Sequence, residues 1–236
     1  MKAATSYTNP LLSGWRLGGG DIQLPNLMYR AWRNLFYGTV GTLFNVRVYE
    51  RHNEPATGGV VYICNHQSYL DPILMSMGLR RPMNYMARDS LFRAWGFRHV
   101  IRKLNAFPVR RNTADLAALK EAMRRLKNNA QVVVFAEGTR SLDGKIAPLL
   151  PGVAMLAQRA ATWTVPVVIE GAIEAWPKNR ILPRPATIQV QYGHAIHKSN
   201  LAGMSSQDLV TMMHAKLVDI QNQLRLRLGR EPINYD

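Results

Sequence analysis

Short, continuous apolar runs alternate along the chain with longer segments in which apolar residues recur every three or four positions. The short runs have the length and β-branched content of buried strands, whereas the longer segments have the period of helices packed on one face. We predict strands, in chain order, at 46–49, 59–64, 131–135, 165–169 and 187–192. Because strands that alternate with helices build an α/β fold, we expect a mixed, largely parallel central sheet flanked by helices.

Two helices have clear start signals. Asn112 is placed to cap a helix that runs to about residue 128, with Asp115 in its first turn. Ser205 and Asp208 form a Ser-x-x-Asp capping box at the start of a helix that reaches about Leu228. The predicted buried face of this last helix consists of Leu209, Met213, Leu217, Ile220 and Leu224.

A further helical stripe lies between residues 27 and 44, with aromatic and aliphatic side chains on one side and Arg30 and Arg33 on the other. Such a helix packs on the protein's own core or lies in the lipid interface, and the pattern alone leaves both readings open. We divide the chain into a flexible N-terminus, an amphipathic helix, an α/β domain and a C-terminal helix packed on that domain, at 1–26, 27–45, 46–200 and 201–236.

Composition adds a strong charge imbalance. The 236 residues include 30 Lys and Arg against 15 Asp and Glu, a net charge of +15, which indicates an anionic partner such as nucleic acid or a phospholipid surface. Charged residues make up only 19% of the chain, below the roughly 25% usual in soluble domains, and this favours a membrane surface. The longest uncharged stretch, 55–70, is shorter than the roughly 20 apolar residues of a spanning helix.

Two processing and redox features also narrow the class. The N-terminal residues lack the apolar core of a secretory signal. Cys64 is the only cysteine, which excludes an internal disulfide framework and a cysteine-based zinc site. Its place in an apolar run is typical of a small buried side chain.

One polar segment follows the predicted strand at 59–64 directly, where α/β proteins place a ligand crevice. His66 lies in the turn, and Asp71 lies at the start of the next helix because Pro72 belongs in its first turn. An imidazole can take a proton from a hydroxyl at neutral pH, and a carboxylate on its other nitrogen fixes the tautomer. The alternative is that Asp71 only caps the helix, alone or in a capping box with Ser68.

A second polar segment, 135–141, follows another predicted strand. Gly138 permits a tight turn, while Thr139 and Ser141 offer hydroxyls and Arg140 offers a fork that matches phosphate oxygens. Glu137 would repel a phosphate, so we expect it to hold an arginine or a hydroxyl of the ligand. The alternative is an ordinary polar loop.

The stretch from Arg80 to Arg111 is strongly basic, with nine Lys and Arg against Asp89 alone. Aromatic and aliphatic residues are interleaved with these cations. Arginines beside aromatic rings suit stacking on nucleic-acid bases, and they equally suit contact with lipid head groups. The sequence of this stretch does not separate the two.

Together these segments resemble the glycerolipid acyltransferase family, which includes the lysophosphatidic acid acyltransferases. The family's motif of Asn-His, four residues and Asp is matched by Asn65, His66 and Asp71. Its Phe-Pro-Glu-Gly-Thr-Arg-Ser motif is matched at 135–141, with Ala136 in place of proline.

Two weaker motifs of the family occur in the expected order. Phe107 and Arg110 match a Gly-x-x-Phe-x-x-Arg motif in which Leu104 replaces the glycine. A Val-Pro-Val strand is matched around Pro166, with Trp163 where another proline is common. The resemblance extends over about 46–192.

The resemblance implies transfer of an acyl group from acyl-CoA or acyl carrier protein to the free hydroxyl of lysophosphatidic acid, which gives phosphatidic acid. It implies that His66 is the general base and that Asp71 orients it, with no metal and no cofactor beyond the acyl donor. The substrate-binding residues that it implies are Asn65, Phe107, Arg110, Glu137, Gly138, Thr139, Arg140, Ser141 and Pro166.

For such an enzyme we expect three partners, namely a lysophospholipid acceptor, the acyl donor and an anionic membrane surface, and no nucleic acid. A peripheral location on the cytoplasmic side of a membrane follows, with residues 27–45 as a membrane-associating helix. The alternatives are an acyltransferase for a different lysolipid or an amino-acid lipid, and a non-catalytic basic module that binds lipid or nucleic acid.

Overall fold

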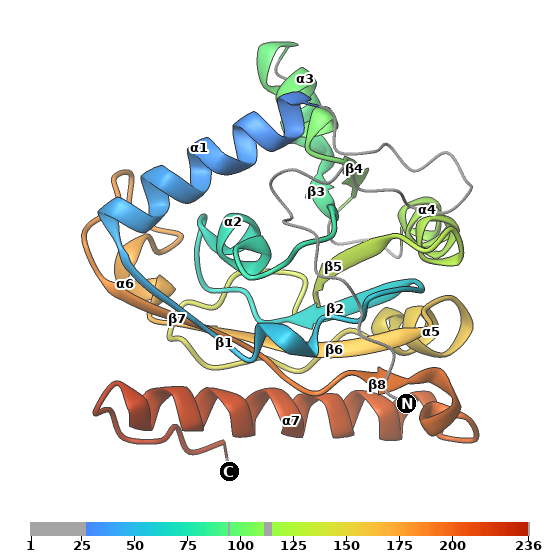
Figure 1. The fold of residues 1–236 in the computed structure, drawn as a ribbon. Coiled ribbons are helices and arrows are strands. Elements are labelled where there is room, and N and C mark those ends of the chain that lie inside the picture. The colour runs from blue at the N-terminus through green and yellow to red at the C-terminus, as the bar shows by residue number, and fades with distance from the viewer. Residues whose placement is uncertain (1–26, 94, 111–114, 236) are drawn as a thin grey trace, which may run out of the picture.

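The computed structural model describes residues 27–93, 95–110 and 115–235. In this part of the chain, eight strands form one sheet in the order β1-β7-β6-β2-β5-β3-β4, and β8 pairs with β6 (Figure 1). The strands are β1 Asn45–Tyr49, β2 Val60–Cys64, β3 Met83–Arg88, β4 Ala106–Val109, β5 Gln131–Phe135, β6 Trp163–Glu170, β7 Thr187–Tyr192 and β8 Ile196–His197. The pairs β6–β7 and β6–β8 are antiparallel and the other pairs are parallel, which confirms the mixed, largely parallel sheet.

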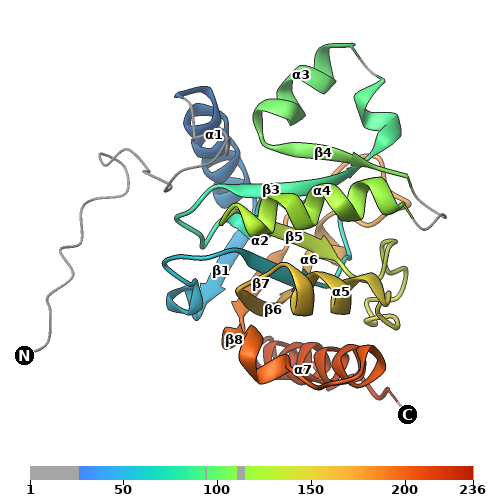
Figure 2. The same cartoon turned by 90° about the vertical axis from the view of Figure 1, so that its right-hand side faces the viewer.

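Helices lie on both faces of this sheet. They are α1 Leu27–Leu43, α2 Asp71–Ser76, α3 Trp95–Lys103, α4 Leu116–Lys127, α5 Gly152–Arg159, α6 Ala172–Ala175 and α7 Ser206–Arg227. One apolar cluster joins α4, α5 and α7 to the sheet, and a second joins α1, α2 and α6 to the opposite face. Figure 1 shows α7 along one face with α1 and α2 across the other, and Figure 2 shows α4 beside α5.

The central strand β2 explains why a continuous apolar run is needed. Val61 and Ile63 belong to the cluster under α7, whereas Tyr62 and Cys64 belong to the cluster under α2. Each of these side chains is fully buried, because both faces of a parallel sheet are covered by helices. Cys64 is therefore the small buried side chain expected, and burial raises the pKa of its thiol.

The five predicted strands are confirmed to within two residues, but β3, β4 and β8 were not predicted. β3 and β4 form the sheet edge beyond β5, and they lie in the arginine-rich stretch. Each strand begins with two buried residues and continues with partly buried or exposed ones, so neither strand needs the continuous apolar run that marks β2. The helix α3 was missed for the same reason, since its polar and apolar residues look like one basic segment.

The helix starts are partly as predicted. At α7 the Ser205 hydroxyl accepts a hydrogen bond from the Asp208 amide at 3.0 Å, and the predicted face is buried. At α4 the predicted cap was wrong, because α4 begins at Leu116 and the Asp115 side chain accepts from the Ala118 amide. Asn112 lies outside the described residues, as does the predicted flexible segment 1–26.

The stripe helix α1 has two different sides. Val40 and Phe44, at and just after its C-terminal turn, are buried in the core, whereas the side chains of Leu35 and Leu43 are more than half exposed. Among helices in the described ranges, none is long and apolar enough to cross a bilayer.

The cations of the basic stretch 80–111 are not all on the surface. The Arg81 guanidinium is buried and donates to the carbonyls of Pro55 and Gly58.

Candidate active site

His66 and Asp71 meet where β2 ends and α2 begins. The Nδ1 atom of His66 lies 2.7 Å from Asp71 Oδ2, and both residues are buried. The same carboxylate oxygen accepts hydrogen bonds from the amides of Gln67 at 2.6 Å and Ser68 at 2.7 Å. The turn therefore folds the carboxylate back onto the imidazole.

The helix-capping alternative explains only part of this geometry. The bond from the Ser68 amide to Asp71 is one half of a capping box, but the Ser68 hydroxyl donates to the Trp176 carbonyl at 2.7 Å. The residue that caps α2 is Leu70, with no side-chain hydrogen bond. Asp71 thus binds the turn and the imidazole.

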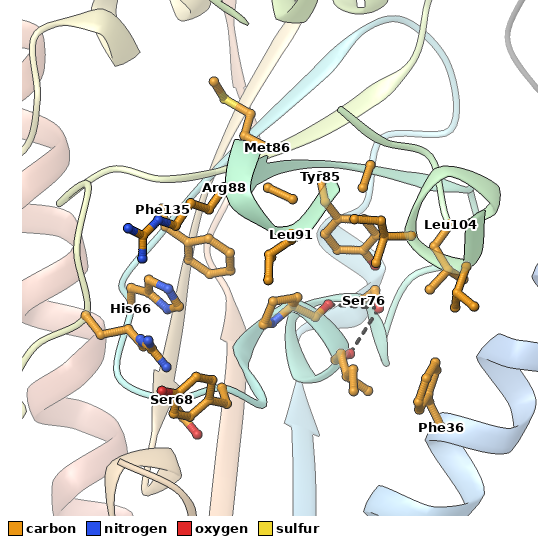
Figure 3. A pocket seen from close by; sticks show the side chains of 18 of the residues that line it. Phe36, His66, Ser68, Ser76, Tyr85, Met86, Arg88, Leu91, Leu104 and Phe135 are labelled. Carbon is orange, nitrogen blue, oxygen red and sulfur yellow. Dashed lines mark hydrogen bonds between the residues drawn. The ribbon is translucent and has the colours of Figure 1, made fainter. Parts of the chain in front are cut away.

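The imidazole of His66 is held on a second side by an aromatic ring. Phe135, the last residue of β5, stacks on it with ring centroids 4.2 Å apart and planes inclined by 20°. Because Nδ1 is bonded to Asp71, Nε2 is the nitrogen that remains for proton transfer. Figure 3 shows the ring at the edge of a cavity.

Glu137 positions this turn from behind. One carboxylate oxygen accepts the His66 amide at 2.7 Å, and the other accepts the Ala147 amide at 3.0 Å. Burial raises the pKa of Glu137 to about 7, and the charges of Asp71 and Asp143 add to the rise, while the two amide hydrogen bonds oppose it. The partners that the structure gives both Glu137 oxygens are therefore backbone amides, and the contact with an arginine or a ligand hydroxyl stays a prediction.

The loop bonded to Glu137 is itself anchored by the last part of the chain. The Ile146 amide donates to the Tyr235 hydroxyl at 2.8 Å, and Tyr235 in turn donates to Gln221 on α7. Gln221 also donates to the Gly144 carbonyl at 2.8 Å. A chain of hydrogen bonds therefore runs from residue 235 through the loop and Glu137 to the backbone of the histidine.

The predicted loop 135–141 forms the other side of the site. Gly138 has φ of 71°, and a Cβ there would lie 2.8 Å from a Leu150 methyl group, so the tight turn requires glycine. The Ser141 amide donates to the His66 carbonyl at 2.8 Å, and the Ser141 hydroxyl bonds Asp143 within the loop. Thr139 is exposed.

Besides Phe135, Arg140 is the residue of this loop that borders the cavity. Its guanidinium carbon lies 3.6 Å from the centre of the Tyr69 ring. One terminal nitrogen is buried and has no hydrogen-bond partner among the described residues. A buried, unsatisfied cation donor at a cavity wall suits an anionic ligand group.

The cavity has a volume of about 510 Å³ and lies between α1, α2, β3 and α3. Its walls are mainly apolar and include Phe36, Ile73, Tyr85, Met86, Leu91, Ile101 and Leu104. Its polar end carries His66, Ser68 and Arg88 (Figure 3). Arg140 also lines the cavity, over the ring of Tyr69, the residue next to Ser68. One cavity therefore joins a proton acceptor, Arg88 and Arg140 to a long apolar space, and Arg33 of α1 is a third arginine in its lining.

Arg88 is a site residue that the sequence reasoning did not single out. It is the last residue of β3, and it lies at the same end of the cavity as His66 and Phe135 (Figure 3). The strands β2, β5 and β3 are neighbours in the sheet, so their carboxyl ends meet. Recognition of β3 as a strand would have pointed to Arg88.

Of the nine predicted substrate-binding residues, Arg140 lines the cavity and the other eight do not. Four of these eight, Glu137, Gly138, Thr139 and Ser141, belong to the loop described above, and the other four lie elsewhere. The Asn65 amide group is bonded to the backbone N–H and carbonyl of Ile169, and Pro166 lies within β6, paired with Ile63. Phe107 is buried beneath the Arg125 guanidinium. Arg110 is exposed, and its amide donates to Asp115 at 2.8 Å.

In the described ranges, no group of three or more His, Cys, Asp and Glu side chains is placed to hold a metal ion. His66, Ser68, Arg88 and Arg140 instead line the cavity with one imidazole, one hydroxyl and two guanidinium groups. These groups suit proton transfer and the binding of an anion.

An imidazole and arginines beside a long apolar cavity in an α/β fold suit a ligand that is both amphipathic and anionic. The chain belongs to the Acyltransferase family, whose model matches residues 45–170. This agrees with the resemblance drawn from the motifs.

Relatives and a solved structure support the same assignment. The chain is 26% identical over 202 residues to the 1-acyl-sn-glycerol-3-phosphate acyltransferase of Bacillus subtilis (strain 168), which covers 84% of this chain and 98% of that protein. It is 30% identical over 162 residues to the enzyme of that name from Cocos nucifera, with 67% and 53% covered. The crystal structure of the 1-acyl-sn-glycerophosphate (LPA) acyltransferase PlsC from Thermotoga maritima matches with a TM-score of 0.71 and 25% identity, over 83% of this chain and 79% of that chain.

Proposed function

We propose that this acyltransferase moves a fatty acyl group from acyl-CoA or acyl carrier protein to the free hydroxyl of lysophosphatidic acid, which gives phosphatidic acid. The observation that carries the proposal is the buried His66–Asp71 pair at the polar end of an apolar cavity that also holds Arg140. The names of the relatives from Bacillus subtilis and Cocos nucifera support the choice of acceptor.

His66 is the general base in the proposed reaction. Nε2 takes the proton of the acceptor hydroxyl while the hydroxyl oxygen attacks the thioester carbonyl, so that a C–O bond forms. The tetrahedral intermediate then breaks its C–S bond, and the proton passes from His66 to the thiolate that leaves. Asp71 holds the Nδ1–H and stabilises the imidazolium between the two steps.

Arg88 and Arg140 bind the acceptor's phosphate. Arg140 supplies an unsatisfied guanidinium nitrogen, and Arg88 lines the same cavity. Guanidinium groups match phosphate oxygens in geometry and charge. The apolar walls of the cavity receive a hydrocarbon chain, which keeps water away from the thioester.

The charge of the protein suits a lipid substrate. A net charge of +15 favours a peripheral position on an anionic membrane surface, on the cytoplasmic side where acyl-CoA and acyl carrier protein are found. Access from that surface delivers an acceptor that is itself a membrane lipid.

The proposal is tested with purified protein, acyl-CoA or acyl carrier protein as donor, and a panel of acceptors. We expect thiol release that depends on lysophosphatidic acid, with phosphatidic acid as the product in mass spectrometry. Lysophosphatidylcholine and an amino-acid lysolipid are the matched acceptors that lack a terminal phosphate. Faster turnover with either of them would overturn the choice of acceptor.

A further inference from the structure

The loop between α6 and β7 presents two apolar side chains directly to solvent. Ile181 is 89% exposed and Leu182 is 72% exposed. The surrounding segment, 177–186, contains Lys178, Arg180 and Arg184 and has no acidic residue. Adjacent bare apolar side chains within a purely basic segment are unusual on a protein surface that faces only water.

Hydrogen bonds hold this loop in a closed shape. The Trp176 indole donates to the Arg180 carbonyl at 3.1 Å, and the Arg184 amide donates to the Ala175 carbonyl at 2.9 Å. The Arg184 side chain donates to the Glu174 carbonyl at 2.6 Å. The exposure of Ile181 and Leu182 at the tip is therefore built into a defined loop.

The loop begins beside the active site. The Tyr69 hydroxyl donates to the Lys178 carbonyl at 3.4 Å, and the Tyr69 ring lies 5.3 Å from that of Trp176. Tyr69 lines the cavity and carries the Arg140 guanidinium on its face. The basic, apolar tip is thus joined to the wall where the proposed acceptor phosphate binds.

The loop ends beside α1. The Ala186 carbonyl accepts from the Asn45 amide at 3.2 Å, two residues after α1 ends. The exposed Leu35 and Leu43 of α1 lie on this side of the sheet, and α7 lies on the opposite side (Figure 1). The loop is therefore joined at one end to the cavity wall at Tyr69 and at the other end to the strand that follows α1.

We propose that the loop 177–186 inserts Ile181 and Leu182 into the interface of an anionic bilayer, with its three cations among the lipid phosphates. This rests on the proposed function, since it places the loop at the membrane that supplies the acceptor. Apolar tips enter the boundary of head groups and acyl chains, and neighbouring Lys and Arg are attracted to anionic lipid. A nucleic acid would use the cations but would leave the two aliphatic side chains in water.

Vesicle binding tests the proposal. The probe is a vesicle of equimolar phosphatidylcholine and phosphatidylglycerol, and binding is measured by flotation. For the double variant Ile181→Ser/Leu182→Ser we expect about tenfold weaker binding, because two buried aliphatic side chains are lost. Wild-type affinity in this variant would overturn the proposal, and loss of self-association with vesicle binding retained would assign the tip to a second copy of the chain.

Leu226 offers a matched control on the opposite face. It is 60% exposed on α7, and it lies between Arg225 and Arg227. Leu182→Ser should weaken vesicle binding, whereas Leu226→Ser should leave it unchanged. Equal effects of the two single substitutions would show that any exposed leucine matters, which contradicts a specific role of the loop.

A fluorescent label tests insertion without relying on weakened binding. Cys64 is the only cysteine and is fully buried, so Ile181→Cys can be labelled selectively with an environment-sensitive dye. We expect a blue shift of the emission when vesicles are added, and no shift for dye attached through Leu226→Cys. An unchanged spectrum at position 181 in vesicle-bound protein would overturn the proposal.

The failure of this proposal is distinguishable from failure of the proposed function. A short-chain lysophosphatidic acid, kept below its micelle concentration, reports on chemistry in the absence of vesicles. The Ile181→Ser/Leu182→Ser variant should release thiol at the wild-type rate with this acceptor. If the wild type itself releases none, the proposed function fails, while the vesicle and fluorescence results still decide the role of the loop.

Discussion

The two sides of the active-site cavity are held together in different ways. At the ends of β2 and β5, buried hydrogen bonds tie His66, Asp71 and Glu137 to backbone amides. On the side of η2 (Asp89–Phe92) and α3 the contacts are apolar, and large side chains such as Leu91 and Trp95 remain exposed. The difference indicates that the proposed catalytic groups are fixed in place by directional hydrogen bonds. The space for the substrate's hydrocarbon chain is instead shaped by apolar packing, which tolerates substitution.

The strongest test of the rigid side is His66→Ala. Removal of the general base should lower kcat by about 10³-fold, because positioned proton transfer contributes roughly 10²–10⁴-fold. The measurement is thiol release under saturating substrates, with circular dichroism to check the fold. A variant that keeps its fold and loses less than tenfold would exclude His66 as the base.

Glu137→Gln tests the same side of the cavity through the backbone of His66, to which Glu137 is bonded. The amide NH₂ of glutamine would face one of the two backbone N–H groups that the carboxylate now accepts. We expect kcat to fall by about tenfold to a hundredfold, with little change in KM for either substrate, since a small misplacement of a catalytic group has effects of this size. A change confined to KM would instead indicate direct contact with substrate.

Glu137 also predicts a pH dependence of stability. Its pKa is about 7 in the folded protein, against about 4.3 in an unfolded chain. Between these values the folded state holds a proton that the unfolded state has released, so the free energy of unfolding falls as the pH rises through this window and levels off above it. Urea unfolding at pH 5 and pH 8 should show this fall in the wild type and a smaller fall in Glu137→Gln. An equal fall in the free energy of unfolding in both proteins would contradict the raised pKa.

Arg140→Ala tests the point where the two sides meet. Loss of one charge-assisted contact should raise KM for lysophosphatidic acid by roughly tenfold to a hundredfold, with KM for the acyl donor unchanged. Arg88→Ala, at the end of β3, should act in the same direction. If KM for the acceptor is unchanged in both variants, the phosphate binds elsewhere.

The smallest effect is expected on the apolar side. Leu91 is partly exposed at the cavity wall, so Leu91→Ala should change the free energy of unfolding by no more than about 0.5 kcal/mol. The ratio of turnover with long-chain donors to turnover with short-chain donors should change by threefold or less, which corresponds to the loss of a weak apolar contact. A loss of kcat as large as that of Glu137→Gln would contradict the contrast between the two sides.

The parts of the fold and site that could be predicted are those with a local signal. A continuous apolar run marks β2 and β5, and the residues just after them include His66 and Arg140. A turn ahead of Pro72 was predicted to bring the Asp71 carboxylate to the His66 imidazole. The structure has this contact, with Nδ1 and Oδ2 2.7 Å apart. Local patterns therefore located the two segments that form the candidate active site.

The parts that could not be predicted depend on distant partners. The bond from the His66 amide to Glu137 joins residues 71 positions apart, and no pattern in either segment reports it. Phe107 and Arg110 belong to a matched motif, but Phe107 packs under Arg125 of α4, and Arg110 follows the end of β4 and is exposed. Arg88 was missed because β3, which lies between β5 and the edge strand β4, has mixed polarity and no clear period.

The bond between Tyr235 and Ile146 has a consequence for how the enzyme is handled in the laboratory. An affinity tag fused behind residue 236 would begin next to the hydroxyl that anchors the loop bonded to Glu137. Such a tag could alter turnover without touching the cavity. Kinetic comparisons between variants should therefore use protein from which any C-terminal fusion has been removed.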